Sequence, residues 1–340
     1  MWALDNRTPY TAERNWVLDK NAEKSWAVAV KATYDIGPDG STKLAEEQEL
    51  IPLYSPEYLA EPGKSSLIYE ADLLGPKQST DIILNGSAYA EHRKPASKVN
   101  VSLIVKDLTK NLVVYGDRSW RWGALGGLSM TSPKPFTSMP LIYERAFGGW
   151  DTRPEDPAKH RLEPRNPIGK GFAVKIEHLL DQAVPNVEYP NQLISSWKDR
   201  PYPAGFGAIA SYWTPRKEFA GTYDEKWQKE RFPLWAEDFD IRFNQCAPPD
   251  QQSNGFLRGG ERVDLINLSP GGRLSFMLPK VYPFFVTKFG KDSVEHRADL
   301  HTVILEPDYP RVIMVWYSSL PCHHRVDELD VTVISEKEFT

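Results

Sequence analysis

The sequence predicts a mainly β fold of two sandwich-like layers or lobes, with an irregular middle segment and few short helices. Three observations predict this fold class. Strand-like runs fill the first third of the chain and return after residue 256; proline and glycine interrupt residues 132 to 255 almost every ten residues; and only two stretches have helical spacing. With 41% hydrophobic residues, including 11 Trp, 15 Tyr and 14 Phe, the chain of 340 residues can bury a large core.

The N-terminal third has the pattern of an all-β segment. Residues 26–36, "WAVAVKATYDI", place apolar side chains on one parity, as a strand does, and "GPDGS" follows as a turn. Three more strand-like runs cover residues 81–91, 98–107 and 111–118. The short stretch "LTKN" separates the last two runs, so we expect it to be the turn of an antiparallel hairpin.

The middle of the chain has no long strand-like runs, and such runs return after residue 256. Residues 173–184 and 223–232 are predicted to be helical, and in the first stretch Ile176, Leu179 and Leu180 have the spacing of one apolar face. Residues 262–268 and 273–279 flank the turn "SPGG" as a hairpin, and "YPFFVTKF", "LHTVILEP" and "RVIMVWYS" follow as strands. We assign residues 1–131 to an N-terminal β-rich lobe and residues 132–340 to the motif-bearing segment and a C-terminal β-rich lobe. One continuous domain is compatible with the same pattern.

Composition excludes several classes of protein. The net charge is −5, and the basic residues are dispersed, so no stripe of cations suits a nucleic-acid backbone. The N-terminus lacks an apolar stretch of signal-peptide length, and no run approaches a membrane span, so we expect a soluble cytoplasmic protein. Two cysteines, Cys246 and Cys322, give no disulfide framework, and their spacing does not show whether they are close in space.

No motif indicates a cofactor, a metal or a catalytic set. "NPIGKGF" (166–172) has a glycine-flanked lysine but lacks the spacing and the Ser or Thr of a phosphate-binding loop, so we interpret it as a tight turn. HExxH, paired cysteines at zinc spacing and GxSxG are all absent. His323 and His324 are adjacent, and adjacent side chains of a strand diverge. The sequence therefore predicts no cofactor, no metal and no enzymatic activity.

An acidic stretch is the main exception to this bland chemistry. In "EDFDIRF" (237–243), Asp238 and Asp240 alternate with apolar residues, which predicts a half-buried strand with its acids on one face. Asp250 follows in the proline turn "APPDQQ". Such a face can meet a partner, a metal or water. We expect Asp238, Asp240 and Asp250 to find arginine or backbone N–H partners, because unpaired buried carboxylates are costly.

Four motifs occur in order: "YERAFGGWD", "NPIGKGF", the long run from "YPAGFGAIASYW" to "NQCAPPDQQ", and "FLRGGERVDLINLSPGGRLSFMLP". Together they resemble a bacterial family catalogued as a domain of unknown function, whose members look like effector adaptors or chaperones of the type VI secretion system. The resemblance extends from residue 26 to about residue 279. Some members have a pentapeptide-repeat extension, and residues 300–340 do not have its five-residue period. The motif residues that we expect to be structural are Glu144, Arg145, Gly148, Gly149, Asn166, Gly169, Gly171, Gly221, Asp238, Asp240 and Asp250.

The resemblance implies a non-catalytic adaptor, encoded beside VgrG spike proteins and PAAR effectors, that binds an effector and loads it onto the spike. A type VI effector is then the expected partner, with VgrG as a second candidate. Aromatic and arginine residues dominate interface energetics, and they are dense in one short segment. The candidates for cargo binding are Phe206, Tyr212, Trp213, Arg216, Tyr223, Trp227, Arg231 and Phe232. The alternative is a carboxylate-based hydrolase acting on a glycan through Glu144, Asp238 or Asp240.

Overall fold

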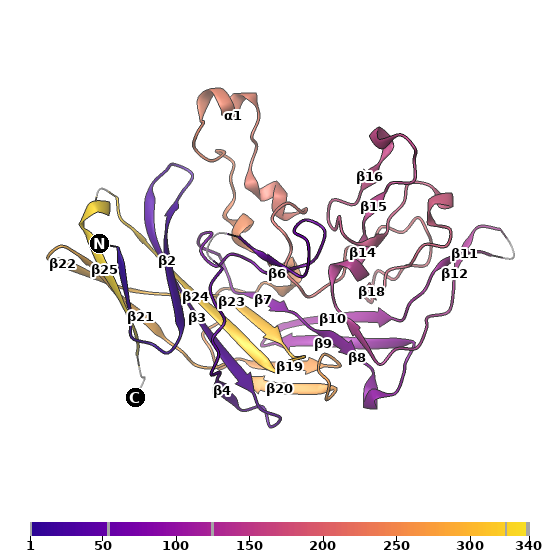
Figure 1. Cartoon of the computed structure of the whole chain (residues 1–340), viewed down its shortest axis with the longest axis horizontal. Helices are drawn as coiled ribbons and strands as arrows, with labels where there is room; N and C mark the ends of the chain where they lie inside the picture. The colour runs from indigo at the N-terminus through magenta and orange to yellow at the C-terminus, as the bar shows by residue number, and fades with distance from the viewer. Residues whose placement is uncertain (1, 53–54, 124–125, 324, 338–340) are drawn as a thin grey trace.

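The computed structural model describes residues 2–52, 55–123, 126–323 and 325–337. It confirms a mainly β fold with several sheets and one short α-helix (Figure 1). The strands up to residue 130 are β1 (Ala3–Asn6), β2 (Thr11–Leu18), β3 (Lys24–Ile36), β4 (Thr42–Leu44), β5 (Glu57–Tyr58), β6 (Leu67–Tyr69), β7 (Asp81–Leu84), β8 (Ser87–Tyr89), β9 (Lys98–Val105), β10 (Leu108–Tyr115), β11 (Trp120–Trp122) and β12 (Leu128–Met130).

The middle segment contains only short elements, and long strands return after it. The middle strands are β13 (Ser138–Pro140), β14 (Phe147–Gly148), β15 (Trp150–Asp151), β16 (Arg161–Leu162), β17 (Lys170–Gly171) and β18 (Val187–Glu188). The later strands are β19 (Arg262–Ile266), β20 (Arg273–Met277), β21 (Pro283–Phe289), β22 (Asp292–Arg297), β23 (Asp299–Glu306), β24 (Arg311–Pro321) and β25 (Leu329–Glu336).

Helical structure is sparse among the described residues. The single α-helix is α1 (Glu225–Glu230). Eight short 3-10 turns accompany it: η1 (Glu91–Arg93), η2 (Tyr143–Arg145), η3 (Pro157–Lys159), η4 (Ile176–Leu179), η5 (Arg216–Ala220), η6 (Ile241–Asn244), η7 (Pro249–Gln251) and η8 (Val326–Glu328).

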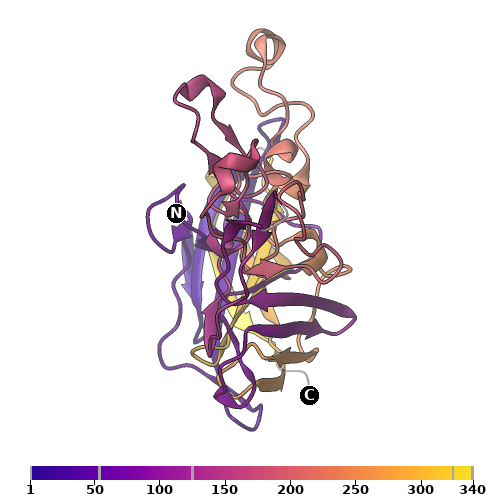
Figure 2. The same ribbon diagram turned by 90° about the vertical axis from the view of Figure 1, so that its right-hand side faces the viewer.

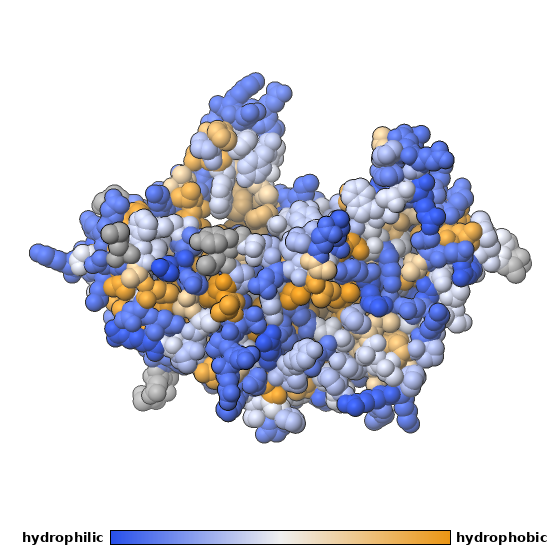
Figure 3. Space-filling view, in the orientation of Figure 1, coloured by the Kyte–Doolittle hydropathy of each residue, from blue (hydrophilic) through white to orange (hydrophobic). Residues whose placement is uncertain are grey.

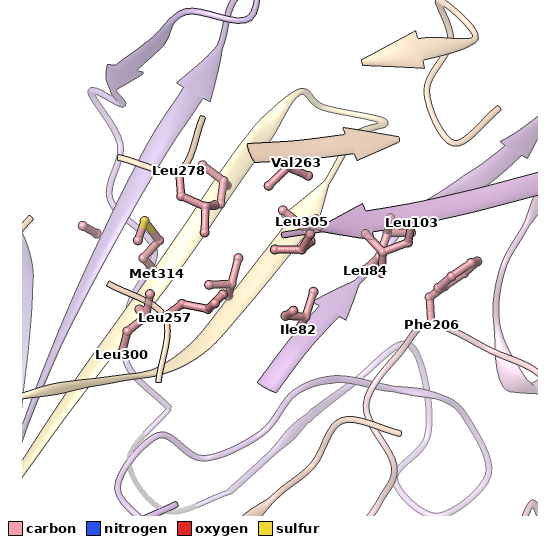
Figure 4. Packing of buried hydrophobic residues seen from close by; sticks show 14 of the residues in the cluster. Ile82, Leu84, Leu103, Phe206, Leu257, Val263, Leu278, Leu300, Leu305 and Met314 are labelled. Atoms are coloured by element: carbon pink, nitrogen blue, oxygen red, sulfur yellow. The ribbon is translucent and has the colours of Figure 1, made fainter. Parts of the chain in front are cut away.

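Three larger sheets form the body of the protein. One has the order β2-β3-β24-β23-β7, with β4 added on β3. The second has the order β18-β10-β9-β19-β20, and the third β1-β25-β21-β22. Buried apolar residues from all three sheets belong to one hydrophobic cluster, part of which is shown in Figure 4. The three sheets therefore contribute to one hydrophobic core.

Strand pairing also joins the two ends of the chain. β3 pairs along its length with β24, β9 pairs with β19, and β1 runs parallel to β25. Residues 1–131 therefore do not complete their own sheets, because their central strands need partners from beyond residue 260. These long-range pairs fix the middle segment at both ends.

β3 is the best predicted strand. Trp26, Val28 and Val30 lie on the face that packs into the main cluster. The opposite face, with Ala27 and Ala29, is buried in a second, smaller cluster. The sequence indicated one apolar parity, whereas the structure covers both faces, as is usual for a central strand.

Both predicted hairpins are confirmed, but the turn between β9 and β10 lies earlier in the chain than predicted. β19 and β20 pair antiparallel around the predicted "SPGG" turn. β9 and β10 also pair antiparallel, but Val105 is opposite Leu108, so the turn is at residues 106–107. "LTKN" is thus the beginning of β10, and the positive φ of Lys106 (53°) makes the turn.

Two local predictions are wrong. Residues 173–184 form only the four-residue turn η4, because Asp181 takes a positive φ of 62° and its N–H donates to the carbonyl of Trp120. Residues 237–243 form no strand either. The carboxylate of Asp240 accepts from the backbone N–H of Arg242 and caps η6, which turns the chain instead of extending it.

Candidate functional site

The middle segment sends out a projection that we call the arm, residues 221–240. α1 lies at its tip and stands away from the sheets in two views of the molecule (Figures 1 and 2). Asp224 begins the helix, because its carboxylate accepts from the N–H of Trp227 at 2.9 Å. A helix of six residues is too short to be stable alone in water, so side-chain contacts must hold the arm.

Three aromatic residues form a cluster on the arm. The Trp227 ring meets Tyr223 edge-on at 4.9 Å between centroids and Phe232 at 5.6 Å. The indole N–H of Trp227 donates to the carbonyl of Leu234 at 2.8 Å, which fixes the ring. Tyr223 is 51% exposed and Phe232 is 67% exposed. This aromatic cluster is therefore ordered by its own contacts and still open to solvent.

Arg231 supports the arm from below. Its guanidinium donates to the carbonyls of Trp235, within the arm, and Lys20, in the turn between β2 and β3. The ammonium of Lys20 donates in return to the carbonyl of Glu237 at 3.0 Å. These bonds brace the arm against the β2–β3 hairpin, so Arg231 is a positioning residue rather than an exposed contact.

Three of the proposed cargo-binding residues lie in the interior. Phe206 and Trp213 are fully buried, and Trp213 packs edge-on against Tyr143 at 5.3 Å. Arg216 is also buried: it pairs with Glu70 and donates to the carbonyls of Phe243 and Ile209. These three residues pack the body, and a partner cannot touch them in this structure.

Tyr212 is the remaining candidate, and it lies apart from the arm cluster. Its ring is exposed on one side and meets Trp213 edge-on at 6.2 Å. Of the eight candidates, the structure therefore brings together Tyr223, Trp227 and Phe232 on the arm, with Arg231 as their support. Three candidates thus lie together on the arm, and two of them, Tyr223 and Phe232, are more than half exposed.

The carboxylate candidates for hydrolysis are each held by a local partner. Glu144 in η2 accepts from the backbone N–H of Ser66 at 2.8 Å and from its hydroxyl at 2.5 Å. Asp238 accepts from the N–H and the hydroxyl of Thr222, which lowers the pKa of Asp238. Arg242 lowers the pKa of Asp240 through its side chain and its N–H.

Asp250 has a different environment from the one predicted. It pairs with the buried ammonium of Lys110 at 2.9 Å and accepts from the hydroxyl of Tyr189 at 3.0 Å. Burial lowers the pKa of Lys110 to about 8, and Asp250 opposes that shift. The partners of Asp238 and Asp240 are of the expected kind, whereas Asp250 uses a lysine and a tyrosine.

The glycine-rich motifs build a tight junction around Asn166. Its side-chain amide donates to the backbone carbonyls of Tyr143 and Phe147 at 2.8 and 3.0 Å. The backbone carbonyl of Asn166 accepts from the N–H of Gly149. A Cβ at Gly148 would lie 2.1 Å from that carbonyl. Gly149, Gly171 and Gly221 have positive φ, and a Cβ at Gly169 would clash with Asn166 and Ala146. Arg145 meets Asn186 and Asp117 nearby at 3.3 and 3.4 Å.

Sequence reasoning missed a buried polar network in the body. Lys77 pairs with Asp81 at 2.6 Å and donates to Thr302, and Asp81 accepts from the N–H of Cys246 at 2.8 Å. The adjoining cavity of about 20 Å³ has room for roughly one water. Burial raises the pKa of Cys246 to about 12, so it is a thiol without nucleophilic character at neutral pH. The spacing in the sequence, 165 residues from Asp81 to Cys246, gave no signal for this network.

The described ranges contain neither a metal-binding group nor a membrane-spanning helix. No group of three or more His, Cys, Asp or Glu residues in those ranges is arranged to hold a metal ion. None of the helices found there combines the length and the apolarity needed to cross a bilayer. Both free cysteines, Cys246 and Cys322, are buried.

Comparison with protein families places the chain. Residues 21–317 match the model of a family described as "Uncharacterized protein conserved in bacteria (DUF2169)", and the chain belongs to that family. The match includes all four motifs and extends beyond them to include β3 on the N-terminal side and part of β24 on the C-terminal side. No curated protein and no solved structure matches the chain. The family description assigns neither an activity nor a partner.

Proposed function

We propose that this family member is a non-catalytic adaptor that binds a type VI secretion effector and helps to load it onto the VgrG and PAAR spike. The observation that carries the proposal is the exposed aromatic cluster on the arm. Large aromatic side chains that are fixed in place and left open to water are typical of protein-binding surfaces. The effector and the spike enter through the resemblance of the four motifs.

The arm supports binding for a second physical reason. Its aromatic rings are held by edge-on contacts and by the bonds of Trp227 and Arg231, so little side-chain entropy remains to be lost on association. We expect the complex to bury on the order of 1,500 Å², with the arm as one contact among several. A surface of that kind holds a cargo without acting on it.

The carboxylates give little support to the glycan hydrolase. Glycosidases use two carboxyl groups that face one gap, about 5 to 10 Å apart. Glu144 is bonded to Ser66, Asp238 to Thr222 and Asp240 to Arg242, and no contact joins these acids to one another among the described residues. We therefore favour the adaptor over the enzyme.

The test is co-expression of the protein with the effector encoded beside it, followed by purification through a tag on the effector. We expect a stoichiometric complex and no turnover. Tyr223→Ser combined with Phe232→Ser is expected to reduce recovery of the complex at least tenfold. Tyr309→Ser, which removes an 80% exposed tyrosine from the turn between β23 and β24, is the matched control and is expected to leave recovery unchanged.

Two further experiments can contradict the proposed adaptor function. Deleting the gene is expected to abolish secretion of that one effector and to leave secretion of others intact; no change in any effector would overturn the adaptor. The hydrolase is tested on peptidoglycan and soluble glycans with the wild type and with Glu144→Gln. Turnover by the wild type that disappears in Glu144→Gln, without loss of folding, would make the protein an enzyme.

A further inference from the structure

A hollow of about 430 Å³ lies against the arm. Its volume is within the usual range of ligand sites, although it opens to solvent. Trp227 lines it together with four acids: Asp224, Glu230, Glu237 and Asp238. The arm therefore combines one face of the aromatic cluster with a recess whose walls are rich in carboxylates. Figure 3 shows hydrophilic residues gathered at the end of this projection, with apolar residues lower down.

The charges around the hollow are not balanced by the chain itself. Lys226 and Arg231 are the cations that line it, two against four carboxylates, and the donors of Arg231 point at the backbone carbonyls of Trp235 and Lys20 rather than at a carboxylate. Neither Glu230 nor Glu237 has a hydrogen bond or an ion pair through its side chain in the part of the chain that the structure describes. Residues 221–240 carry six carboxylates and three cations in all. An occupant with positive charge would supply what is missing.

We infer that the hollow of the arm receives a basic segment of the protein partner, with an arginine or lysine side chain placed between Trp227 and the free carboxylates of Glu230 and Glu237. This inference rests on the proposed adaptor function and names the chemistry of the cargo segment. A guanidinium can stack on an indole and donate two hydrogen bonds to a carboxylate at the same time.

The site is formed before the partner arrives. Asp224 is fixed by the N–H of Trp227, and Asp238 by the N–H and the hydroxyl of Thr222. These donors do not neutralise the carboxylates, and those on Asp238 lower its pKa, so Asp238 stays charged. Lys20 approaches from the hairpin: its ammonium donates to the carbonyl of Glu237, and its charge helps to lower the pKa of Asp238. Glu230 and Glu237 are the lining carboxylates left without an ion pair among the described residues. The negative potential of the hollow is thus part of the folded arm.

The test uses the full chain and a fluorescein-labelled dodecapeptide of alternating arginine and serine, measured by fluorescence polarisation at low salt. The comparison peptide has glutamate in place of arginine. Glu230→Gln combined with Glu237→Gln removes the two free carboxylates. The control is Glu218→Gln in η5 combined with Glu225→Gln in α1, which removes two charges that do not line the hollow. Circular dichroism checks that all variants are folded.

We expect the wild type and the control variant to bind the arginine peptide with equal affinity. The Glu230/Glu237 variant is expected to bind at least tenfold more weakly, and the glutamate peptide not to bind. Equal affinity of both variants, or binding of both peptides, would overturn the inference. If the effector co-purifies but the peptide binds both variants equally, the adaptor function is supported and the binding of a basic segment in the hollow is contradicted. If the peptide binds the Glu230/Glu237 variant more weakly than the control but no effector co-purifies, the basic-segment site is supported and the adaptor function is contradicted.

Discussion

Arg216 and Arg242 offer a test of burial within one segment. Both pair with a carboxylate, Arg216 with Glu70 and Arg242 with Asp240. The side chains of the first pair are 3% and 10% exposed, and those of the second 55% and 32%. Arg216→Ala leaves Glu70 without its cation and removes the side-chain donor of two part-buried carbonyls, those of Phe243 and Ile209. Breaking a buried pair from one side costs about 3 to 5 kcal/mol, whereas an exposed pair is worth about 0 to 1 kcal/mol.

The expected shift in melting temperature follows from the size of the chain. An unfolding entropy of about 2.1 cal/mol/K per residue gives about 0.7 kcal/mol/K for the whole chain. Arg216→Ala is then expected to lower Tm by about 4 to 7 °C, and Arg242→Ala by less than about 1.5 °C. Thermal denaturation followed by circular dichroism measures both. Arg216→Met combined with Glu70→Leu removes both charges and is expected to recover most of the loss. Equal Tm values for the two alanine variants would refute the argument.

Three further outcomes follow from local environments. Burial lowers the pKa of His296 to about 4, below 6.5 for the open chain, so stability is lost as pH falls from 6.5 to 4, by up to about 3 kcal/mol; urea titrations of His296→Gln are expected to show less of that loss. Gly149→Ala puts a Cβ 2.3 Å from the carbonyl of Gly169 and is expected to lower Tm more than Gly272→Ala, which has a similar φ and open space. Cys246 is expected to resist Ellman's reagent until urea unfolds the protein.

Local pattern was enough for the strands that form the centre of the sheets. The single-parity run of β3 and the "SPGG" hairpin needed only neighbours in sequence to be recognised. The same pattern could not show that Lys31, on the other face of β3, is fully buried and pairs with Asp72 at 3.0 Å. That partner comes from a loop 41 residues away, so no periodicity encodes it.

The wrong predictions have a common physical cause. Helical spacing in residues 173–184 is real, since Leu179 is buried with Trp120 and Phe147. The chain nevertheless leaves the helix after one turn, because the N–H of Asp181 reaches the carbonyl of Trp120 instead of a helical one. In the same way a short-range bond from Asp240 replaced the expected strand. Competing hydrogen bonds of single residues decided both cases, and alternation of apolar residues does not report on them.

Some of the candidate cargo-binding residues are buried and others are exposed, and composition could not predict which. Trp213 and Trp227 are both tryptophans of one aromatic segment, yet one is in the core and the other is on the arm. Burial depends on contacts with distant residues such as Tyr143, and only the fold supplies these. What the sequence did indicate was the density of aromatics and arginines, which proved to be shared between packing and surface.

The arm can be both short and ordered because its bonds close it at two points. Thr222 and Asp238 bond near its two ends, and Arg231 joins its middle to Lys20 of the hairpin. A six-residue helix gains little from its own backbone, so these braces and the contacts of Trp227 must supply its order. The braces use main-chain carbonyls and one carboxylate, and within the described part of the chain they leave the side chains of Glu230 and Glu237 unpaired. Glu230 and Glu237 therefore lie exposed beside a fixed indole, where the positively charged segment that we infer would reach both carboxylates.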